Sequence, residues 1–378
     1  MDVRLSAEQK ALRDAAAQVV GNLAPKTVAD LDDAERRAKL DAAVDATGWR
    51  ELRAAADPTS GAAPLASGVE VGIVAEELGR TVADVAFLGP TLAAELRRLA
   101  GAPPADGPET VAFRPDLSAI ATATVNASSP SVTYGDAGSA PGSGASGNPT
   151  AAAASLARPA LAFDAAGATS ALLLVPTDGG GHALATVTLP GEVHDSAVVD
   201  LTRTSLPLAA GTPVDRVDGA AALSDEALTR WTALGLAAVS ADLVGAMAGA
   251  TELARAYAVE RHQYGVAVGS FQAVQHLLAD AFVATEGARS AALHAAWAVD
   301  ALPADDALFA GAVAKAFATR AARTACESAI QVHGGIGNTW ECLAHVHLRR
   351  ALLTGDLLGG AGPNLDRVLA HHGIEAGA

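Results

Sequence analysis

The stretch QVHGGIGNTWE, residues 331–341, interrupts a part of the chain that otherwise favours long helices. Glycine costs about 1 kcal/mol relative to alanine inside a helix, so Gly334, Gly335 and Gly337 together predict that a helix ends here. A backbone without side chains also lets another molecule come close, and free N–H groups at the start of a following helix attract anions. We expect that following helix to begin near Thr339. The stretch predicts either a site for an anionic ligand or a glycine cap between two helices.

A second polar stretch, ERHQYGVAVGSFQAVQ at residues 260–275, lies earlier in the chain. Arg261 stands where a long helix is expected to end, and the helix dipole favours a cation there. Phe271 and Gln272 begin the next expected helix. A plain helix–turn–helix connection explains these residues as well as a ligand site does, so local physics leaves both interpretations open.

The composition indicates a helix-rich protein that does not bind nucleic acid. Of its 378 residues, 50% are hydrophobic but only 4% are aromatic, so the apolar residues are mainly Ala, Leu and Val. Alanine is the best helix former, which favours a helical fold. The formal net charge of −16 argues against a nucleic-acid partner, because phosphate contacts need a basic face.

Cysteine usage and the apolar segments narrow the cellular setting. Cys326 and Cys342 form no Cys-x-x-Cys pair or Cys/His cluster, so we expect neither a disulfide framework nor a metal site. The N-terminal MDVRLSAEQK has no basic segment followed by an apolar one, and no signal peptide is expected. Residues 233–251 are the best membrane candidate, but Asp242 interrupts them, which favours a buried helix. We expect a cytoplasmic protein with no membrane partner.

Three regions follow one another, and their order predicts a mostly helical α+β fold. Residues 1–102 are helical in pattern, residues 103–220 hold short Val-, Leu- and Thr-rich runs between turn residues, and residues 221–378 are helical again. Helices are expected from Ser6 to about 22 and at 67–82, 90–100, 225–258, 271–301, 305–330, 339–355 and 362–371, and strands at 119–125, 170–175, 183–189 and 196–201.

Local signals refine this pattern at three places. Ser6 and Gln9 form a capping-box signature at the start of the first helix. Asp225 is the expected cap of the long helix at 225–258. Residues 137–156, AGSAPGSGASGNPTAAAASL, are of low complexity, so we expect a loop there and no strand.

The two polar stretches together resemble the acyl-CoA dehydrogenase family. The combination is Arg261-x-x-x-Gly265, then Phe271-Gln272, and finally Gln331-x-x-Gly-Gly-x-Gly. In the N-terminal region, Thr47-Gly-Trp49 and Glu76-Glu-Leu-Gly-Arg80 are similar to two further elements of the family. The resemblance spans nearly the whole chain and is strongest from 224 to 372.

The resemblance implies a domain order and a cofactor. It implies an N-terminal helical domain at 1–102, a middle β-barrel-like domain at 103–220 and a C-terminal four-helix bundle at 221–378. It also implies FAD, an acyl-CoA substrate and an electron-transfer flavoprotein as acceptor. In that family FAD crosses a subunit interface, and a neighbouring subunit holds its pyrophosphate and adenosine. The matching positions, and so the implied cofactor-binding residues, are Arg261, Phe271, Gln272, Gln331, Gly334 and Gly335.

The catalytic base of the family has no counterpart in this sequence. The family reaction needs a Glu that takes a proton from the carbon α to the thioester. The two positions where members carry this Glu match Leu358 and Gly235, and neither can accept a proton. Asp356 is the nearest displaced candidate. The family's TEPxxGSD-like run and PExxGG loop are also missing, so we assign no catalytic residue.

These observations leave three interpretations. In the first, the chain resembles the degenerate subunit of actinobacterial heterotetrameric acyl-CoA dehydrogenases of the steroid side-chain type. It would then supply FAD contacts to a paralogous subunit that performs α,β-dehydrogenation of an acyl-CoA thioester. In the second, the chain is a self-sufficient homo-oligomeric enzyme with a displaced base such as Asp356. In the third, it is a non-catalytic scaffold subunit. The acyl group, whether steroid, branched, fatty or polyketide, stays open.

Overall fold

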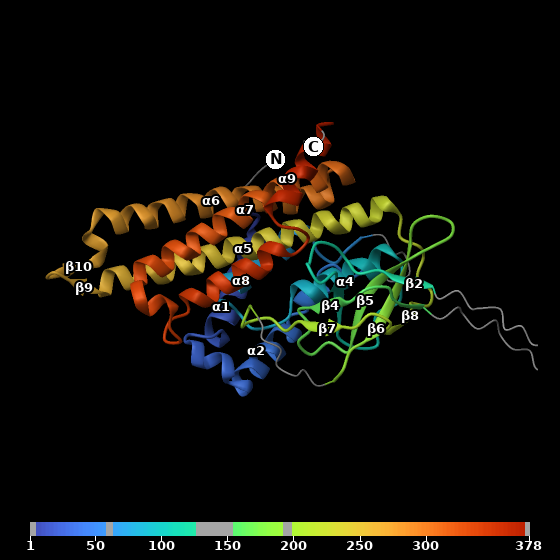
Figure 1. Ribbon diagram of the computed structural model, residues 1–378, viewed down its shortest axis with the longest axis horizontal. Helices are drawn as coiled ribbons and strands as arrows, with labels where there is room; N and C mark the ends of the chain where they lie inside the picture. The colour runs from blue at the N-terminus through green and yellow to red at the C-terminus, as the bar shows by residue number, and fades with distance from the viewer. Residues whose placement is uncertain (1–4, 58–62, 126–153, 192–198, 375–378) are drawn as a thin grey trace, which may run out of the picture.

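The computed structural model of the chain describes residues 5–57, 63–125, 154–191 and 199–374 (Figure 1). Helices at the N-terminal end lead into a sheet, and the sheet leads into a bundle of long helices. The expected mostly helical α+β class is therefore confirmed.

The N-terminal helices pack against one another and against the bundle. They are α1 (Ala7–Leu23), α2 (Ala34–Ala46), α3 (Gly68–Arg80) and α4 (Leu88–Leu99), with short 3-10 turns η1 (Val28–Asp32) and η2 (Trp49–Glu51). The capping box at the start of α1 is confirmed, because Gln9 N donates to Ser6 Oγ at 3.1 Å and Ser6 N donates to Gln9 Oε1 at 3.0 Å. The sequence pattern does not predict α2, since this helix buries only Leu40 and Val44 and its apolar stripe is too narrow to stand out.

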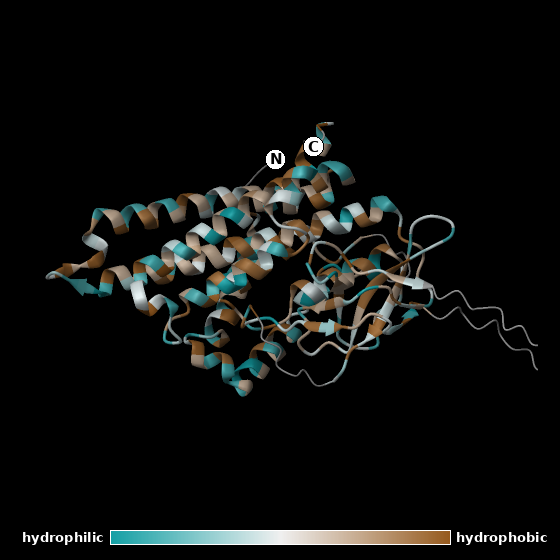
Figure 2. Ribbon diagram, in the orientation of Figure 1, coloured by the Kyte–Doolittle hydropathy of each residue, from teal (hydrophilic) through white to brown (hydrophobic). Residues whose placement is uncertain are grey.

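Eight strands form one curled sheet in the order β2-β3-β8-β6-β5-β1-β4-β7. They are β1 (Glu109–Phe113), β2 (Ala123–Val125), β3 (Ala154–Leu156), β4 (Ala160–Phe163), β5 (Ser170–Pro176), β6 (His182–Thr188), β7 (Leu206–Leu208) and β8 (Pro213–Arg216). Along β5, Leu172 and Leu174 face the core shared with the helices, whereas Leu173 and Val175 face a second core inside the sheet. Hydrophobic residues accordingly run along these strands (Figure 2).

Two expectations for this region are wrong in part. Residues 199–201 of the expected strand at 196–201 are not in a strand, and 196–198 lie outside the described residues. The last residues of the expected loop at 137–156 form a strand, β3, which pairs with β2 and β8. The segment has a weak β propensity of its own, and the neighbouring strands supply its backbone hydrogen-bond partners. The remainder of that loop, 137–153, lies outside the described residues. The unpredicted strands β1, β4, β7 and β8 are short, at three to five residues each.

The C-terminal helices are α5 (Asp225–Glu260), α6 (Gln272–Ala301), α7 (Ala304–His333), α8 (Ala344–Asp356) and α9 (Ala361–His371). A hairpin, β9 (His262–Gln263) and β10 (Val266–Ala267), and the 3-10 turn η3 (Val268–Ser270) join α5 to α6; the 3-10 turn η4 (Gly334–Asn338) follows α7. The helix α5 is long and apolar enough to cross a membrane, but its most apolar window is wholly buried inside the fold.

Two expected helix starts in this region are wrong. The cap of α5 is Ser224, whose Oγ accepts from Ala227 N at 3.2 Å, while Asp225 is already the first helical residue. The helix expected to begin near Thr339 begins at Ala344, because η4 and a turn occupy the residues after His333. Hydrophilic and hydrophobic residues alternate along the bundle helices (Figure 2).

A buried ionic network joins the three regions of the chain. The carboxylate of Asp242 on α5 accepts hydrogen bonds from Arg203 of the sheet region at 2.8 Å and from Arg350 of α8 at 2.6 Å. Arg350 also donates to the carbonyl of Ala83 between α3 and α4 at 2.9 Å. Burial disfavours the charged carboxylate, but the two guanidinium groups outweigh it and hold the pKa of Asp242 below its usual value.

Asp242→Ala is expected to lower the free energy of unfolding by about 3–5 kcal/mol, because it leaves two buried guanidinium groups without their carboxylate. Since the folded-state pKa of Asp242 is depressed, its stabilisation is present above the unfolded carboxyl pKa of about 4 and is lost as the pH falls through the folded value. The difference in the free energy of unfolding between wild type and variant should therefore become smaller at acidic pH. Urea unfolding at neutral and acidic pH measures both effects.

The control for this experiment is Asp366→Ala on the exposed face of α9. It should change the free energy of unfolding by about 0.5 kcal/mol or less. If Asp242→Ala were equally mild at neutral pH, the network would not hold the three regions together.

Candidate functional site

The residues expected to bind a cofactor lie at one end of the bundle. There α5 ends, β9 and β10 protrude beyond the helices, and α6 begins (Figure 1). The C-terminus of α7 reaches the same end, because the ring of His333 stacks on Tyr257 of α5 with centroids 4.6 Å apart. The two polar stretches, separate in sequence, are therefore neighbours in space.

All six expected cofactor-binding residues are exposed. They are Arg261, Phe271, Gln272, Gln331, Gly334 and Gly335. The guanidinium group of Arg261 has no ion-pair partner among the residues that the structure describes, and 39% of Phe271 is exposed. Neither Arg261 nor Phe271 lines either of the two cavities found among the described residues, and both lie on the surface at the end of the bundle. They form a surface that a second molecule can complete.

The hairpin of β9 and β10 exposes Tyr264 next to the expected cofactor-binding residue Phe271. Tyr264 and Gly265 form a two-residue turn between β9 and β10, with φ of 54° and 80°. Positive φ at both positions is the geometry of a type I′ turn, which favours glycine second. Tyr264 is 94% exposed and contacts Phe271 edge-to-face at 6.3 Å. Sequence reasoning did not single out Tyr264, although the Gln-Tyr-Gly-Val hairpin pattern was available as a signal.

Arg261 is held by backbone hydrogen bonds on both sides. Its N–H donates to the carbonyl of Tyr257 at 2.9 Å and ends α5, and its carbonyl accepts from Val268 N at 2.7 Å. The turn also needs Gly269, because a Cβ there would come 2.9 Å from the carbonyl oxygen of Ala258. The base of the Arg261 side chain is therefore fixed, while its guanidinium group stays available.

The glycines of the 334–337 turn serve different purposes. Gly334 has φ 65° and ψ −142°, a conformation that other residues rarely adopt. Gly337 lies against Ile330 and His333, where a Cβ would be 2.9 Å from a carbonyl oxygen. Gly335 has neither constraint: its φ is not in the left-handed region, and a Cβ would meet nothing within 4 Å. The fold of this chain therefore does not require glycine at 335.

The two positions where a base was expected meet inside the protein. A Cβ at Gly235 on α5 would overlap the Cδ1 atom of Leu358, and Leu92 lies 3.5 Å from it. Leu358 is 2% exposed. One turn before Gly235, Trp231 donates from Nε1 to the carbonyl of Leu92 at 2.9 Å. Hydrocarbon fills the place where two independent family positions would put a carboxylate.

The segment that carries Leu358 is held rigidly. Leu358 has φ 60°, which costs a non-glycine residue free energy and persists only where the surroundings enforce it. Its N–H donates to the carbonyl of Leu117 at 2.8 Å, and its carbonyl accepts from Arg367 at 2.8 Å. The next carbonyl, of Gly359, accepts from the buried ammonium of Lys315 at 3.0 Å. Asp356 is exposed, on the solvent side of this segment, and does not join the cluster around Leu358.

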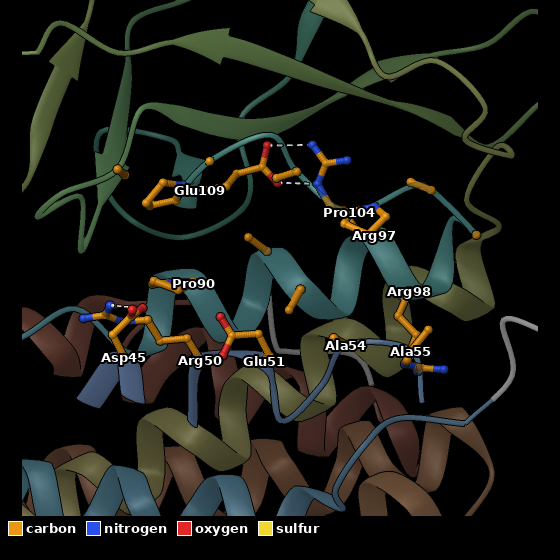
Figure 3. Close-up of a pocket in the computed structure, with 18 of the residues that line it drawn as sticks. Asp45, Arg50, Glu51, Ala54, Ala55, Pro90, Arg97, Arg98, Pro104 and Glu109 are labelled. Atoms are coloured by element: carbon orange, nitrogen blue, oxygen red, sulfur yellow. Dashed lines mark hydrogen bonds and ion pairs between the residues drawn. The ribbon is translucent and has the colours of Figure 1, made fainter. Parts of the chain in front are cut away.

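A cavity of about 430 Å³ lies elsewhere, between α4, η2 and the segment 101–109 (Figure 3). Alanine and proline form most of its wall. Its three arginines are already neutralised: Arg97 pairs with Glu109 at 2.6 Å, Arg98 with Glu95 at 2.7 Å and Arg50 with Asp45 at 3.4 Å. These pairs leave the cavity without a free cation for a phosphate-bearing ligand.

A more polar cavity of about 890 Å³ lies beside the buried ionic network, between η1 and the segments 164–166 and 200–205. Neither cavity is lined by Leu358, Gly235 or Arg261. The site residues therefore fall into two groups: an exposed set at the bundle end and a filled position in the interior.

Comparison with known proteins supports the resemblance. Residues 230–362 match the family model described as acyl-CoA dehydrogenase, C-terminal domain. Acyl-CoA dehydrogenase FadE34 of Mycobacterium tuberculosis is 38% identical over 211 residues, which are 54% of this chain and 28% of FadE34. The chain thus spans less than a third of the length of this relative.

Two solved structures share the fold over nearly the whole chain. A variant of the Tcur3481-Tcur3483 steroid ACAD has a TM-score of 0.75 and 22% identity, and the match covers 97% of this chain and 98% of that chain. The ChsE4-ChsE5 complex from Mycobacterium tuberculosis has a TM-score of 0.72 and 23% identity, with 100% of both chains covered.

Gly235→Ala is expected to lower the free energy of unfolding by about 1–3 kcal/mol, because the new methyl group overlaps Leu358 in a filled core. The sign is informative, since alanine inside a helix otherwise gains about 1 kcal/mol over glycine. Combining Gly235→Ala with Leu358→Ala should cost less than the sum of the two single changes. Chemical denaturation of the four proteins measures the coupling.

The matched control is Gly21→Ala in α1, where a Cβ meets nothing within 4 Å. It should stabilise the protein or leave it unchanged. Additive effects of Gly235→Ala and Leu358→Ala would contradict the contact between these two positions.

Proposed function

We propose that the chain, whose residues 230–362 match the C-terminal domain model of the acyl-CoA dehydrogenase family, is one subunit of an FAD-dependent acyl-CoA dehydrogenase. In this proposal it does not perform the chemistry alone. It supplies the contacts that hold the pyrophosphate and adenosine of FAD to a paralogous subunit, which carries the base and the flavin-ring pocket.

The observation that carries this proposal is a contrast: hydrocarbon fills the interior base position, whereas the exposed Arg261 has no ion-pair partner among the described residues. A carboxylate that takes a proton must reach the substrate carbon. Here the side chain of Leu358, packed against Gly235, fills that position with hydrocarbon. Hydrogen bonds from Lys315 and Arg367 to the backbone carbonyls at 359 and 358 hold the segment around Leu358 in place. The bundle end, in contrast, presents Arg261 without a partner among the described residues.

Distance supports the division between two sites. Gly235 lies ten residues after the first residue of α5, and Arg261 caps the end of the helix, so 26 residues, or roughly 39 Å along the helix, separate them. One FAD molecule held at its pyrophosphate by Arg261 cannot place its flavin ring beside Gly235 of the same chain. Arg261 therefore serves a flavin whose ring lies in another subunit.

The exposed residues suit the non-reacting half of FAD. Arg261 would donate charge-assisted hydrogen bonds to the pyrophosphate, and Gly335 would admit the dinucleotide close to the backbone. Phe271, Gln272, Gln331 and Gly334 would line the same surface. Bound there, FAD would supply the acceptor for the hydride from the β carbon of the acyl group. The work of this chain is to position the cofactor, since Leu358 and Gly235, at the two expected base positions, cannot accept a proton.

The partner we propose is a paralogous acyl-CoA dehydrogenase subunit in a heterotetramer. Two of the similar solved structures, Tcur3481-Tcur3483 and ChsE4-ChsE5, carry paired names. The steroid ACAD among them favours a lipid or steroid acyl-CoA as the substrate class. We further propose an electron-transfer flavoprotein as electron acceptor and a cytoplasmic location.

The test is the visible absorbance of oxidised flavin in the purified chain, alone and after co-expression with a paralogous acyl-CoA dehydrogenase encoded beside it. Flavin bands and dehydrogenase activity in the pair alone would support the proposal. Flavin bound at full occupancy by the lone chain would overturn it and favour a homo-oligomeric enzyme. An assembled pair without flavin would favour a scaffold role.

Gly335→Val is expected to weaken FAD binding by the pair roughly tenfold or more while leaving the stability of the isolated chain nearly unchanged. The reason is that a side chain at 335 meets nothing in this chain but enters the space of the cofactor. Titration of the flavin-free pair with FAD measures the first effect, and thermal unfolding of the chain measures the second.

Gly179→Val is the control, because a Cβ at this turn also meets nothing within 4 Å. It should change neither quantity. Equal FAD affinity in the Gly335→Val pair and the wild-type pair would contradict the role of the turn.

Asp356→Asn is expected to keep the dehydrogenation rate of the pair within about twofold of wild type, since Asp356 is exposed and lies apart from the Leu358 cluster. The measurement is substrate-dependent reduction of an artificial electron acceptor. A large loss of rate with normal flavin content would instead identify Asp356 as the displaced base.

A further inference from the structure

The bundle end can hold one FAD molecule only if two separate segments keep a fixed spacing. One is the Arg261 segment between α5 and α6, and the other is the glycine turn after α7. Both are exposed, and each is anchored to a different helix. A side-chain contact between α5 and α7 next to these segments would set their relative position before the partner binds.

Tyr257 is attached directly to the first segment. Its carbonyl accepts the N–H of Arg261 at 2.9 Å, so it closes the last turn of α5 from which the guanidinium group projects. Tyr257 is half-buried, and its ring lies on the imidazole of His333 at the end of α7, with centroids 4.6 Å apart and planes inclined by 28°. This is an offset stack of the kind that aromatic pairs favour.

His333 is attached directly to the second segment. It is the last residue of α7, is 6% exposed and immediately precedes Gly334. Its Nδ1 lies 2.7 Å from the carbonyl oxygen of Ala329, which can only accept, so Nδ1 carries a proton and fixes the ring orientation. The Cβ of His333 also lies 3.0 Å from the position that a Cβ at Gly337 would take, so the turn folds tightly around this residue.

We infer that Tyr257 and His333 are positioning residues that couple the two cofactor-holding segments. They form a continuous path: Arg261 to Tyr257 through a backbone hydrogen bond, Tyr257 to His333 through the stacked rings, and His333 to Gly334 through the chain. The stack sets the distance between the Arg261 side chain and the glycine turn, so both reach the same dinucleotide of the partner. This inference rests on the proposed function.

The experiment measures FAD affinity of the co-purified pair for His333→Ala, Tyr257→Ala, the double variant, His333→Phe and Tyr257→Phe. Each alanine variant should weaken FAD binding by roughly two- to tenfold, the range that an aromatic pair supports. The double variant should weaken it no further than one single change, because either change already removes the coupling. The rate at saturating FAD should stay unchanged, since neither residue touches the reacting atoms.

The phenylalanine variants separate positioning from general damage. His333→Phe and Tyr257→Phe keep a stacked ring and should restore FAD affinity to within about twofold of wild type. Affinity losses that add in the double variant, or alanine variants with wild-type affinity, would overturn the inference. If an alanine variant fails to fold, the phenylalanine variants still decide, because a tenfold loss in them would show that stacking is not the property that matters.

Arg261→Ala distinguishes failure of this inference from failure of the proposed function. If it weakens FAD binding while His333→Ala and Tyr257→Ala do not, the proposed function stands and the positioning role falls. If Arg261→Ala also binds FAD like wild type, the exposed bundle end is not the cofactor surface, and both fall together.

Discussion

The docking of the three regions depends on the carboxylate of Asp242. Arg203 reaches it from the segment before β7 and Arg350 from α8, and Arg350 also binds the carbonyl that follows α3. Charges that are this deeply buried are tolerated only when every partner is in place. Misplacing any one region leaves a charge uncompensated in the core, so the network favours a single arrangement of helices, sheet and bundle.

The same network joins α5, which carries Gly235 and leads to Arg261, to α8, which leads to Leu358. Arg350 fixes α8, and α8 ends in the segment that carries Leu358. Asp242 lies two turns beyond Gly235 on α5, and that helix continues to Arg261. One helix therefore carries a filled interior position near its start and leads to the exposed Arg261 at its end. In the proposed function, the filled base position and the cofactor contact do not conflict, since they are roughly 39 Å apart along the helix.

Local signals predicted most helices because those signals act within a few residues. The Ser6–Gln9 capping box formed as expected, and the long bundle helices follow the apolar spacing of the sequence. Short strands such as β7 and the helix α2 were not predictable, because their stability comes from neighbours distant in sequence. The start of α8 was misplaced since the glycine turn continues through η4 before the next helix begins.

The sequence by itself determined which residue types stand at the candidate positions. It showed no proton acceptor at 235 or 358, an arginine at the end of an expected helix and a glycine-rich turn. Only the tertiary structure decided that Leu358 and Gly235 meet, that Gly335 is free of internal constraint and that Tyr257 stacks on His333. The reason is physical: residue type sets what a side chain can do, whereas long-range packing sets which side chains meet.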